Sequence, residues 1–332
     1  MKKFINHVDN VLVESLSGFA SAHGDLVSLH LDPVYITRQN KAKNKVAIIS
    51  GGGCGHEPLH AGYIGFGMLD AACPGHVFTS PTPDQMLAAA EAVNTGNGIL
   101  FIVKNYSGDV MNFEMAAEML PFESATVLTS DDVAVINSTY TTGRRGVAGT
   151  VIVEKCVGSL AETGASLQAC KALGDKVNHR IASMGVALTS CTVPAAGRPT
   201  FDIDHTELEM GVGIHGEPGR RREVMREADA IVKDCVDAII ADFIARGIDF
   251  NNEALLLING FGATPLMELY LIYNTAAKLF SQHGIKITRS LVGNYVTALD
   301  MAGASITLCV LDDEIKQHWD TPVHTAALRW GV

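Results

Sequence analysis

Two histidines stand in glycine-rich segments that lie far apart in the sequence. His56 belongs to SGGGCGHEP at 50–58, and His215 belongs to GVGIHGEPG at 211–219. A neutral imidazole is a competent nucleophile near neutral pH, and flanking glycines leave its ring open to a small ligand. A single histidine of this kind is most often a surface residue. The repeated pattern instead predicts a cleft to which both segments contribute.

The segment at 50–58 directly follows an apolar run and could surround a ligand with backbone N–H groups. Successive glycines allow these groups to point into one concavity, which suits a phosphate or a hydroxylated ligand. The segment is not a Walker loop, because no Gly-Lys-Ser/Thr follows, and it fails G-x-G-x-x-G because His56 occupies the last glycine position. A tight turn between a strand and a helix is an equally good interpretation of these glycines alone.

Two further polar segments carry candidate side chains. The segment KNYSGD follows a second apolar run, and its Lys104 and Asp109 suit a site that contains a carboxylate base. Ser80 in the segment FTSPTP is a candidate of the same kind. A solvent-exposed turn and a helix cap are the alternative interpretations of these two segments.

The segment at 211–219 matches the G-x-G-x-x-G spacing of dinucleotide-binding loops. The residues before it, DIDHTELEM at 202–210, lack the apolar run expected of a buried strand. A nucleotide-dependent oxidoreductase therefore has only this isolated match in its favour, and we discount it.

The elements that must position these segments alternate between strand and helix patterns. Apolar runs predict strands, and apolar residues spaced by three and four predict helices. The predicted strands lie at 45–50, 98–103, 126–128, 150–153, 185–188, 254–258, 286–290 and 304–311. The predicted helices lie at 83–93, 166–178, 221–246 and 266–283. This alternation predicts an α/β fold with largely parallel or mixed sheets.

We divide the chain into two packed α/β domains with mixed sheets. The N-terminal domain covers 1–183 and contains the ligand loops 50–58 and 104–109. The C-terminal domain covers 184–332 and contains the His215 loop. No Pro- or Ser-rich linker marks the boundary near 183–190, so we expect the domains to pack against each other.

The composition excludes several functional classes. The 332 residues include 25 Lys and Arg against 36 Asp and Glu, a net charge of −11, which argues against direct binding to nucleic acid or an anionic membrane. The seven cysteines are odd in number and form no C-x-x-C pair, so neither a disulfide framework nor a metal site is expected. Because we find no signal peptide and no apolar run of membrane-spanning length, we expect a cytoplasmic protein.

Taken together, the motifs resemble those of the dihydroxyacetone kinase family, in its substrate-binding subunit. The resemblance runs nearly end to end through SGGGxGHEP, FTSPTPD, KNYSGD, GRRGVAGT, CTVPAAGRP, GVGIHGEPG and NGFGATPLMELY. Seven motifs in order are far more specific than any one of them. The resemblance implies two α/β domains, a homodimer, and the stand-alone subunit that lacks the ATP-binding domain of single-chain versions.

The resemblance also assigns roles to residues of the matching motifs. His215 is expected to bond covalently to the carbonyl carbon of dihydroxyacetone and give a hemiaminal. Asp109 is expected to take the proton from the substrate hydroxyl, and His56 to hydrogen-bond and polarise the substrate. The other residues expected to contact or border the substrate are Gly52, Gly53, Cys54, Ser80 and Lys104.

Partners follow from the same resemblance. The phosphoryl group is expected to come from a partner subunit that holds ADP and magnesium and is recharged by a phosphohistidine protein. No cofactor and no metal are expected on this chain. The alternative is a paralogue that binds dihydroxyacetone in the same way and serves as a co-activator of a transcription regulator. Two departures keep this alternative open: Cys54, where serine is expected, and Arg220, where an apolar residue is usual.

Overall fold

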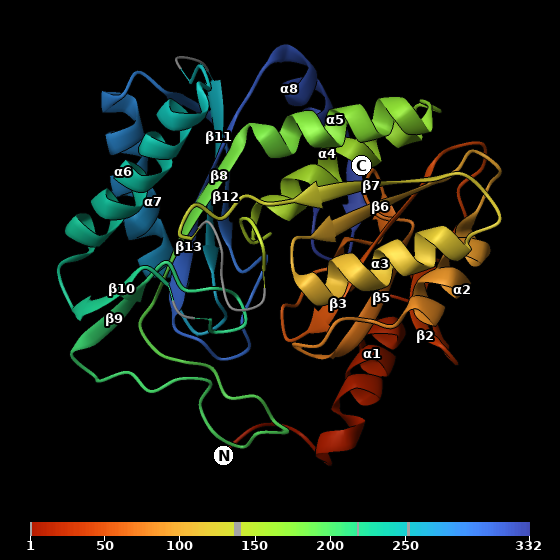
Figure 1. The fold of residues 1–332 in the computed structure, drawn as a ribbon, viewed down its shortest axis with the longest axis horizontal. Coiled ribbons are helices and arrows are strands. Elements are labelled where there is room, and N and C mark those ends of the chain that lie inside the picture. Colours follow the sequence, from red (N-terminus) through yellow and green to blue (C-terminus); the bar gives the residue numbers. More distant parts are fainter. Residues whose placement is uncertain (1, 136–140, 218, 251–252) are drawn as a thin grey trace.

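Two mixed β-sheets of six strands each organise the molecule (Figure 1). The computed structural model describes residues 2–135, 141–217, 219–250 and 253–332. In spatial order, the first sheet contains β1 (Val27–Leu31), β2 (Val34–Arg38), β5 (Ala71–Val77), β3 (Ala47–Cys54), β6 (Ile99–Lys104) and β7 (Ser124–Thr129). The four strands from β5 to β7 are parallel, and β1 and β2 add antiparallel pairs at one edge. The carboxyl ends of the parallel strands therefore meet at one edge of the sheet, where a ligand can bind.

The second sheet is mostly antiparallel. In spatial order, it contains β10 (Arg221–Val224), β9 (Glu207–Met210), β8 (Ile181–Ala187), β13 (Gly303–Val310), β11 (Glu253–Gly260) and β12 (Lys286–Gly293). Only the pair of β11 and β12 is parallel. The predicted fold class, α/β with mixed sheets, is confirmed.

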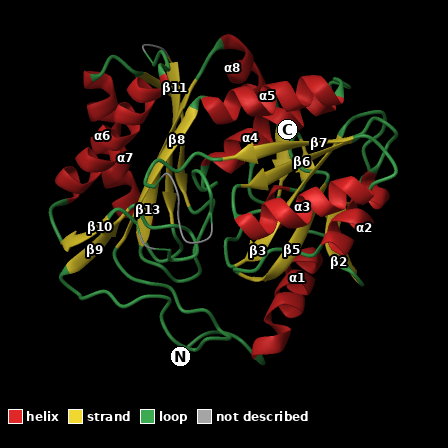
Figure 2. Ribbon diagram, viewed as in Figure 1, coloured by secondary structure: helices red, strands yellow, loops and turns green. Residues whose placement is uncertain are grey.

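Helices cover the faces of both sheets (Figures 1 and 2). On the first sheet, α2 (Pro83–Val93) and α3 (Ser107–Met119) pack on one face, and α4 (Gly149–Glu162) and α5 (Leu167–His179) pack on the other. The helices α6 (Ala228–Arg246) and α7 (Leu266–Gln282) cover one face of the second sheet. The remaining helical elements are η1 (Val8–Asn10), α1 (Val11–Ala22), η2 (Ala61–Tyr63) and α8 (Asp313–Asp320).

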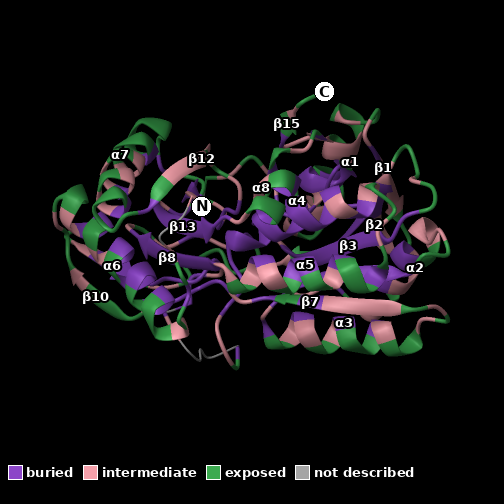
Figure 3. Cartoon of the chain, turned by 90° about the horizontal axis from the view of Figure 1, so that it is seen from above, coloured by how far each residue is buried: buried purple, intermediate pink, exposed green. Residues whose placement is uncertain are grey.

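The helix α4 occupies the centre of the molecule and corrects one prediction. Nearly all of its residues are buried (Figure 3), and it belongs to a core cluster that also includes Leu255 and Leu257 of the second sheet. The run Val151, Ile152 and Val153 suggested a strand at 150–153, because β-branched residues favour strands. That prediction was wrong: the helix is buried on all sides, so it shows no amphipathic pattern, and tertiary packing overrides propensity.

Two predictions around 202–246 also need correction. Residues Glu207–Met210 form the strand β9, whose last three residues are buried although the segment looked polar. Arg221–Val224 pairs antiparallel with β9 as β10, so the helix expected at 221–246 begins only at Ala228. Because a strand and not a helix follows the glycine segment, the local architecture differs from a dinucleotide-binding βαβ unit.

The C-terminal segment returns to the first half of the chain. In the three-stranded sheet, β14 (Val323–Thr325) pairs with both β15 (Arg329–Trp330) and β4 (Gly65–Phe66). The Lys155 ammonium on α4 donates to the carbonyl of His318 at 2.8 Å and to the hydroxyl of Thr321 at 2.9 Å. The predicted boundary at 183–190 falls within and just after β8. The last segment of the chain lies beyond this boundary, yet it packs against elements of the first half.

Candidate active site

A cavity of about 350 Å³ lies at the carboxyl ends of the parallel strands of the first sheet. It is lined by Gly53, Phe78, Ser80, Tyr106, Gly108, Asp109 and His215. All of these except His215 come from the ends of β3, β5 and β6 or the start of α3, and His215 comes from the segment between β9 and β10. The two glycine-rich segments predicted to form one cleft do meet here.

The imidazole of His215 is held by the carboxylate of Glu217. Nδ1 of His215 lies 2.9 Å from Oε1 of Glu217, and the His215 amide donates to Oε2 of the same carboxylate at 3.0 Å. Burial alone would raise the pKa of Glu217, but His215 and Arg145 lower that pKa to about 2. The carboxylate therefore stays ionised and fixes the proton on Nδ1, which leaves Nε2 as the nitrogen available to a ligand. The ring itself is partly exposed to the cavity, since 19% of the side chain is accessible.

Arg145 and Gly213 lie against this glutamate. The Arg145 guanidinium is fully buried and donates to Oδ2 of Asp132 at 2.7 Å and to the carbonyl of Gly211 at 2.7 Å. A Cβ at Gly213 would overlap Oε2 of Glu217 and lie 2.7 Å from Nη1 of Arg145. Only glycine at 213 therefore lets these two side chains share one space.

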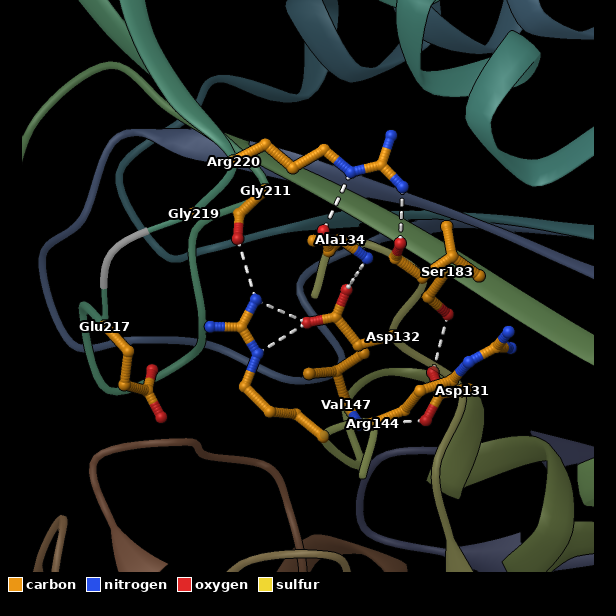
Figure 4. A network of polar contacts seen from close by, with 12 residues as sticks. Asp131, Asp132, Ala134, Arg144, Val147, Ser183, Gly211, Glu217, Gly219 and Arg220 are labelled. Carbon is orange, nitrogen blue, oxygen red and sulfur yellow. Dashed lines mark hydrogen bonds and ion pairs between the residues drawn. The ribbon is translucent and has the colours of Figure 1, made fainter. Parts of the chain in front are cut away.

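The unexpected Arg220 ties the His215 segment to the first half of the chain. Its guanidinium donates to the carbonyl of Ala134 at 2.7 Å and to that of Val133 at 2.5 Å, beside Asp132 (Figure 4). The residue is exposed, but its hydrogen-bonding end is turned onto the protein backbone. This departure from the usual apolar residue adds a contact between the segments that carry Asp132 and His215.

His56 is neutral and presents an acceptor. Its Nδ1 lies 2.7 Å from the carbonyl of Thr297, so Nδ1 carries the proton and donates. Burial, and then the neighbouring His215 and Lys104, lower the pKa of His56 well below its usual range. The buried Nε2 has no hydrogen-bond partner in the described part of the chain, so it is left as an acceptor beside His215, although His56 itself does not line the cavity. The ring meets that of His215 edge-on, with centroids 4.7 Å apart.

The glycines of the first cluster make room for protein atoms. The ring of Phe78 stacks on His56 with centroids 4.9 Å apart. A Cβ at Gly53 would lie 2.8 Å from the Phe78 backbone, and one at Gly55 would lie 2.7 Å from the Phe78 ring. These contacts do not favour a phosphate-binding loop at this cluster, because the 78–79 segment fills the space beside both glycines.

Asp109 lies in the first turn of α3 and is almost fully buried at the edge of the cavity. The predicted loop at 104–109 is therefore short: Lys104 ends β6, and α3 begins at Ser107. Carboxylates are stabilised near a helix N-terminus, where backbone N–H groups are unpaired. Ser80 packs across this turn, because a Cβ at Gly108 would lie 2.8 Å from its hydroxyl.

Lys104 is buried and does not line the cavity. Its ammonium donates to the carbonyl of Gly51 at 3.3 Å, lies 3.0 Å from Nε2 of His60, and lies 3.5 Å from Oδ2 of Asp109. Two of its N–H groups are thus used in hydrogen bonds to Gly51 and His60, and the contact with Asp109 is an ion pair. Lys104 therefore contacts Asp109 and not the cavity, and Gly52, whose missing side chain leaves space for this ammonium, is likewise not a lining residue.

Comparison with known proteins places the chain in a family. A model of the Dak1 domain matches residues 17–327, nearly the whole sequence. The chain belongs to the Dak1 family. The family resemblance stated from the motifs is confirmed.

The relatives of this Dak1 chain include kinase subunits of similar length. The Escherichia coli (strain K12) "PEP-dependent dihydroxyacetone kinase, dihydroxyacetone-binding subunit DhaK" is 49% identical, with 100% of both chains covered. A Listeria innocua "PTS-dependent dihydroxyacetone kinase 1, dihydroxyacetone-binding subunit DhaK" is 47% identical, with 95% of both covered. The solved "Dihydroxyacetone kinase operon co-activator Dha-DhaQ" has a TM-score of 0.89 and 33% identity, over 97% of this chain and 98% of that one. The Dak1 chain is thus related to kinase subunits and to a co-activator.

A second cavity of about 360 Å³ lies on the other side of β3, under α1. Its walls include Gly52, Gly53, Cys54 and His60, so Gly53 borders both cavities. Cys54 is half-buried, and burial raises the pKa of its thiol, as does the nearby Glu57. The structure places Cys54 on this second cavity, away from the residues that face His215.

Three residues of the Dak1 site had no role in the sequence analysis. Glu217 belongs to the GVGIHGEPG motif, and its position two residues after His215 could have indicated that the two side chains pair. Tyr106 was visible in KNYSGD, and its ring meets the His215 ring edge-on at 4.6 Å. Phe78 lacked any signal, because its position depends on glycines of another strand.

Within the ranges given above, no group of three or more His, Cys, Asp or Glu side chains is arranged to hold a metal ion. Among the same residues, no helix has the length and apolar character needed to cross a membrane.

Proposed function

We propose that this chain is the dihydroxyacetone-binding subunit of a dihydroxyacetone kinase, and that it holds the ketone covalently on His215. The observation that carries this proposal is the pair of His215 and Glu217 facing a cavity that Asp109 also lines. It is supported by two kinase-subunit relatives of nearly the same length, at 49% and 47% identity.

In the first step, Nε2 of His215 bonds to the carbonyl carbon of the ketone. The electron pair of the carbonyl π bond moves to oxygen, which takes a proton from solvent and becomes a hydroxyl. The alkylated ring then carries positive charge unless Nδ1 gives up its proton. The buried carboxylate of Glu217 stabilises that charge, because it lies 2.9 Å from Nδ1.

In the second step, Asp109 takes the proton from a substrate hydroxyl as that oxygen attacks the incoming phosphoryl group. The bond between this group and the nucleotide on the partner subunit breaks, and ADP stays on that subunit as the leaving group. His56 accepts a hydrogen bond from the substrate through its free Nε2. Gly53 and Ser80 lie on the wall of the same cavity and border the ligand. Glycerol has the same carbons and hydroxyls but no carbonyl, so it cannot form the covalent bond to His215.

The donor of the phosphoryl group belongs to a partner subunit in this proposal. That subunit holds ADP and magnesium and is recharged by a phosphohistidine protein, while this chain holds no cofactor of its own. A homodimer located in the cytoplasm is part of the same proposal.

The second candidate is a ligand-sensing co-activator of a transcription regulator, which would use the same covalent bond as its detector. It is favoured by the full-length structural similarity to the co-activator, with a TM-score of 0.89. The kinase subunit takes precedence because the identity to its relatives, 49%, exceeds the 33% to that co-activator.

The test is to follow adduct formation and phosphoryl transfer separately. Mass spectrometry of the purified chain with dihydroxyacetone should show one adduct per chain, which His215→Ala abolishes. With phosphorylated donor subunits, Asp109→Asn should keep the adduct but slow product formation by about 10²–10⁴-fold, the usual contribution of a general base. An adduct with no turnover in the wild type would leave the co-activator, and an adduct that survives His215→Ala would overturn the site.

A further inference from the structure

Four ionisable side chains form a buried row that begins at the cavity and leads into the core. Oδ2 of Asp109 lies 3.5 Å from Nζ of Lys104, which lies 3.0 Å from Nε2 of His60. Nδ1 of His60 then lies 2.6 Å from Oε1 of Glu154, on the central helix α4. Only Asp109 of these four lines the active-site cavity.

The hydrogen-bond directions along the row follow from its chemistry. The Lys104 ammonium can only donate, so Nε2 of His60 accepts and Nδ1 of His60 carries the proton. Burial, and then Lys104, lower the pKa of His60 well below its usual range, which keeps the ring neutral. The Nδ1–H must therefore donate to Glu154, and each partner in the row fixes the orientation of the next.

Glu154 ends the row and is the residue whose charge can change near neutral pH. Burial raises the pKa of Glu154 to about 8, although the nearby Lys104 lowers it. Its second oxygen, Oε2, has no hydrogen-bond partner among the residues that the structure describes. The titratable groups that face it are His60, Lys104 and the Tyr63 hydroxyl, which itself donates to the carbonyl of Tyr295 at 2.7 Å.

Gly52 makes the row possible. A Cβ at Gly52 would overlap the Lys104 ammonium and lie 3.5 Å from Nε2 of His60. Any side chain there would push Lys104 away from His60 or from Asp109. The second glycine of SGGGCGHEP therefore serves the row and not the ligand.

We propose that His60 and Glu154 are positioning residues of the proposed phosphoryl-transfer reaction, which act on Asp109 through Lys104. They hold the Lys104 ammonium beside Asp109, and the ionisation of Glu154 sets how strongly Asp109 attracts a proton. An ionised Glu154 offsets part of the positive charge of Lys104, so Asp109 becomes a stronger base. This proposal rests on the function proposed above, and it predicts faster phosphoryl transfer as Glu154 loses its proton.

The test compares Glu154→Gln with the wild type over pH 6–9.5, with dihydroxyacetone and donor subunits. In the wild type, the transfer rate should rise by about tenfold as Glu154 loses its proton. A change of this size is expected when one negative charge is added near the partly screened ion pair of Lys104 and Asp109. Glu154→Gln should lose this rise and keep the low-pH rate, while the amount of adduct stays the same. Gly52→Ala should lower transfer over the whole range, because it displaces Lys104.

The matched control is Glu162→Gln on the same helix. Glu162 also pairs with buried or partly buried cations, Lys45 and Arg38, but it lies outside the row. Its variant should keep the wild-type rise in rate. A rise that persists in Glu154→Gln, or that vanishes equally in Glu162→Gln, would overturn the proposal.

A second measurement does not depend on turnover. The ¹³C carboxyl signal of Asp109 in the unliganded wild type should show an extra step as Glu154 titrates. That step should be absent in Glu154→Gln and present in Glu162→Gln. If the wild type shows the step but transfers no phosphoryl group, the row stands and the proposed kinase function fails. If the step is absent from the wild type, the row does not act on Asp109.

Discussion

The two histidine segments have nearly the same composition, yet the structure gives them different chemistry. At His56, Nδ1 donates to a backbone carbonyl, that of Thr297, and the ring is buried and neutral. At His215, Nδ1 meets the carboxylate of Glu217, and the ring is partly exposed. The nearby Glu57 carboxylate accepts from the amide of Gly55 through both oxygens, and in the described part of the chain it makes no hydrogen bond to the His56 ring.

The difference shows that the partner of Nδ1 decides what each ring can do. A carbonyl partner fixes the tautomer but adds no charge, so His56 is suited to accept a hydrogen bond. A carboxylate partner also stabilises positive charge, so His215 is suited to form a covalent bond. The glutamate directly follows the histidine in His-Glu-Pro, whereas one glycine separates the two in His-Gly-Glu-Pro. This shift of one residue decides whether the carboxylate contacts a backbone amide or the imidazole.

The strongest test of this comparison exchanges each glutamate for its neutral isostere. Glu217→Gln should slow adduct formation by about 10²–10⁴-fold, because the ring loses both its fixed tautomer and the nearby negative charge. Glu57→Gln, the matched change in the other segment, should leave the rate within about twofold, since the Glu57 carboxylate is bound to the Gly55 amide and the Cys54 side chain and not to a ring nitrogen of His56. Stopped acid-quench samples analysed by mass spectrometry give both rates. Equal effects of the two variants would contradict the comparison.

A smaller effect is expected at His56. The variant His56→Gln offers an amide oxygen on a longer, flexible side chain and loses the stacked ring, so the hydrogen bond to the ligand is weakened. Adduct formation should slow by up to about tenfold, the rate change that corresponds to one hydrogen bond of about 1.4 kcal/mol. The extent of adduct at saturating dihydroxyacetone should remain one per chain. Complete loss of the adduct would show that His56 is needed for the covalent step itself.

The smallest effect concerns stability in acid. Because the pKa of His56 is well below 6.5 in the folded protein, the unfolded chain binds a proton below pH 6.5 that the folded chain does not. Stability is therefore retained above pH 6.5 and falls below it, by about 1.4 kcal/mol per pH unit for this group. Urea unfolding at pH 7, 6 and 5 should show this loss, and it should be smaller in His56→Gln.

The control for acid stability is His205→Gln, at a side chain that is 90% exposed. This variant should keep the wild-type dependence on pH. His60 should contribute in the same direction as His56, because burial lowers its pKa as well. An identical fall in the wild type and in His56→Gln would show that His56 titrates normally in the folded protein.

The sequence was sufficient to predict that the segments carrying Gly53 and Asp109 share one edge of the first sheet, because the signals are local. Strand ends followed by glycine or by polar residues place Gly53 and Asp109 at one edge of a parallel sheet, and the structure agrees. The helix at 83–93 was predicted to the residue, since Thr82 and Pro83 give strong start signals. The assignment of His215 to a hemiaminal came from the family resemblance and not from spacing.

What the sequence did not predict depends on contacts between distant residues. Lys104 was expected at the substrate, but His60 and Gly51 take its N–H groups. Arg220 was a departure that kept the co-activator alternative open, yet its guanidinium donates to carbonyls in the segment 133–134. Neither contact leaves a periodicity or a motif, so single-sequence patterns could not reveal them.

The return of the C-terminal segment has a consequence for synthesis on the ribosome. The strand β4 at Gly65–Phe66 finds its partner only when Val323–Thr325 has emerged, and Lys155 finds two acceptors only in residues 318–321. A nascent chain thus carries the open edge of β4 from residue 66 until residues 323–325 emerge, and the Lys155 ammonium lacks these two acceptors until residues 318–321 emerge. The first half cannot be completed as an independent folding unit, in contrast to the usual order in which N-terminal domains finish first.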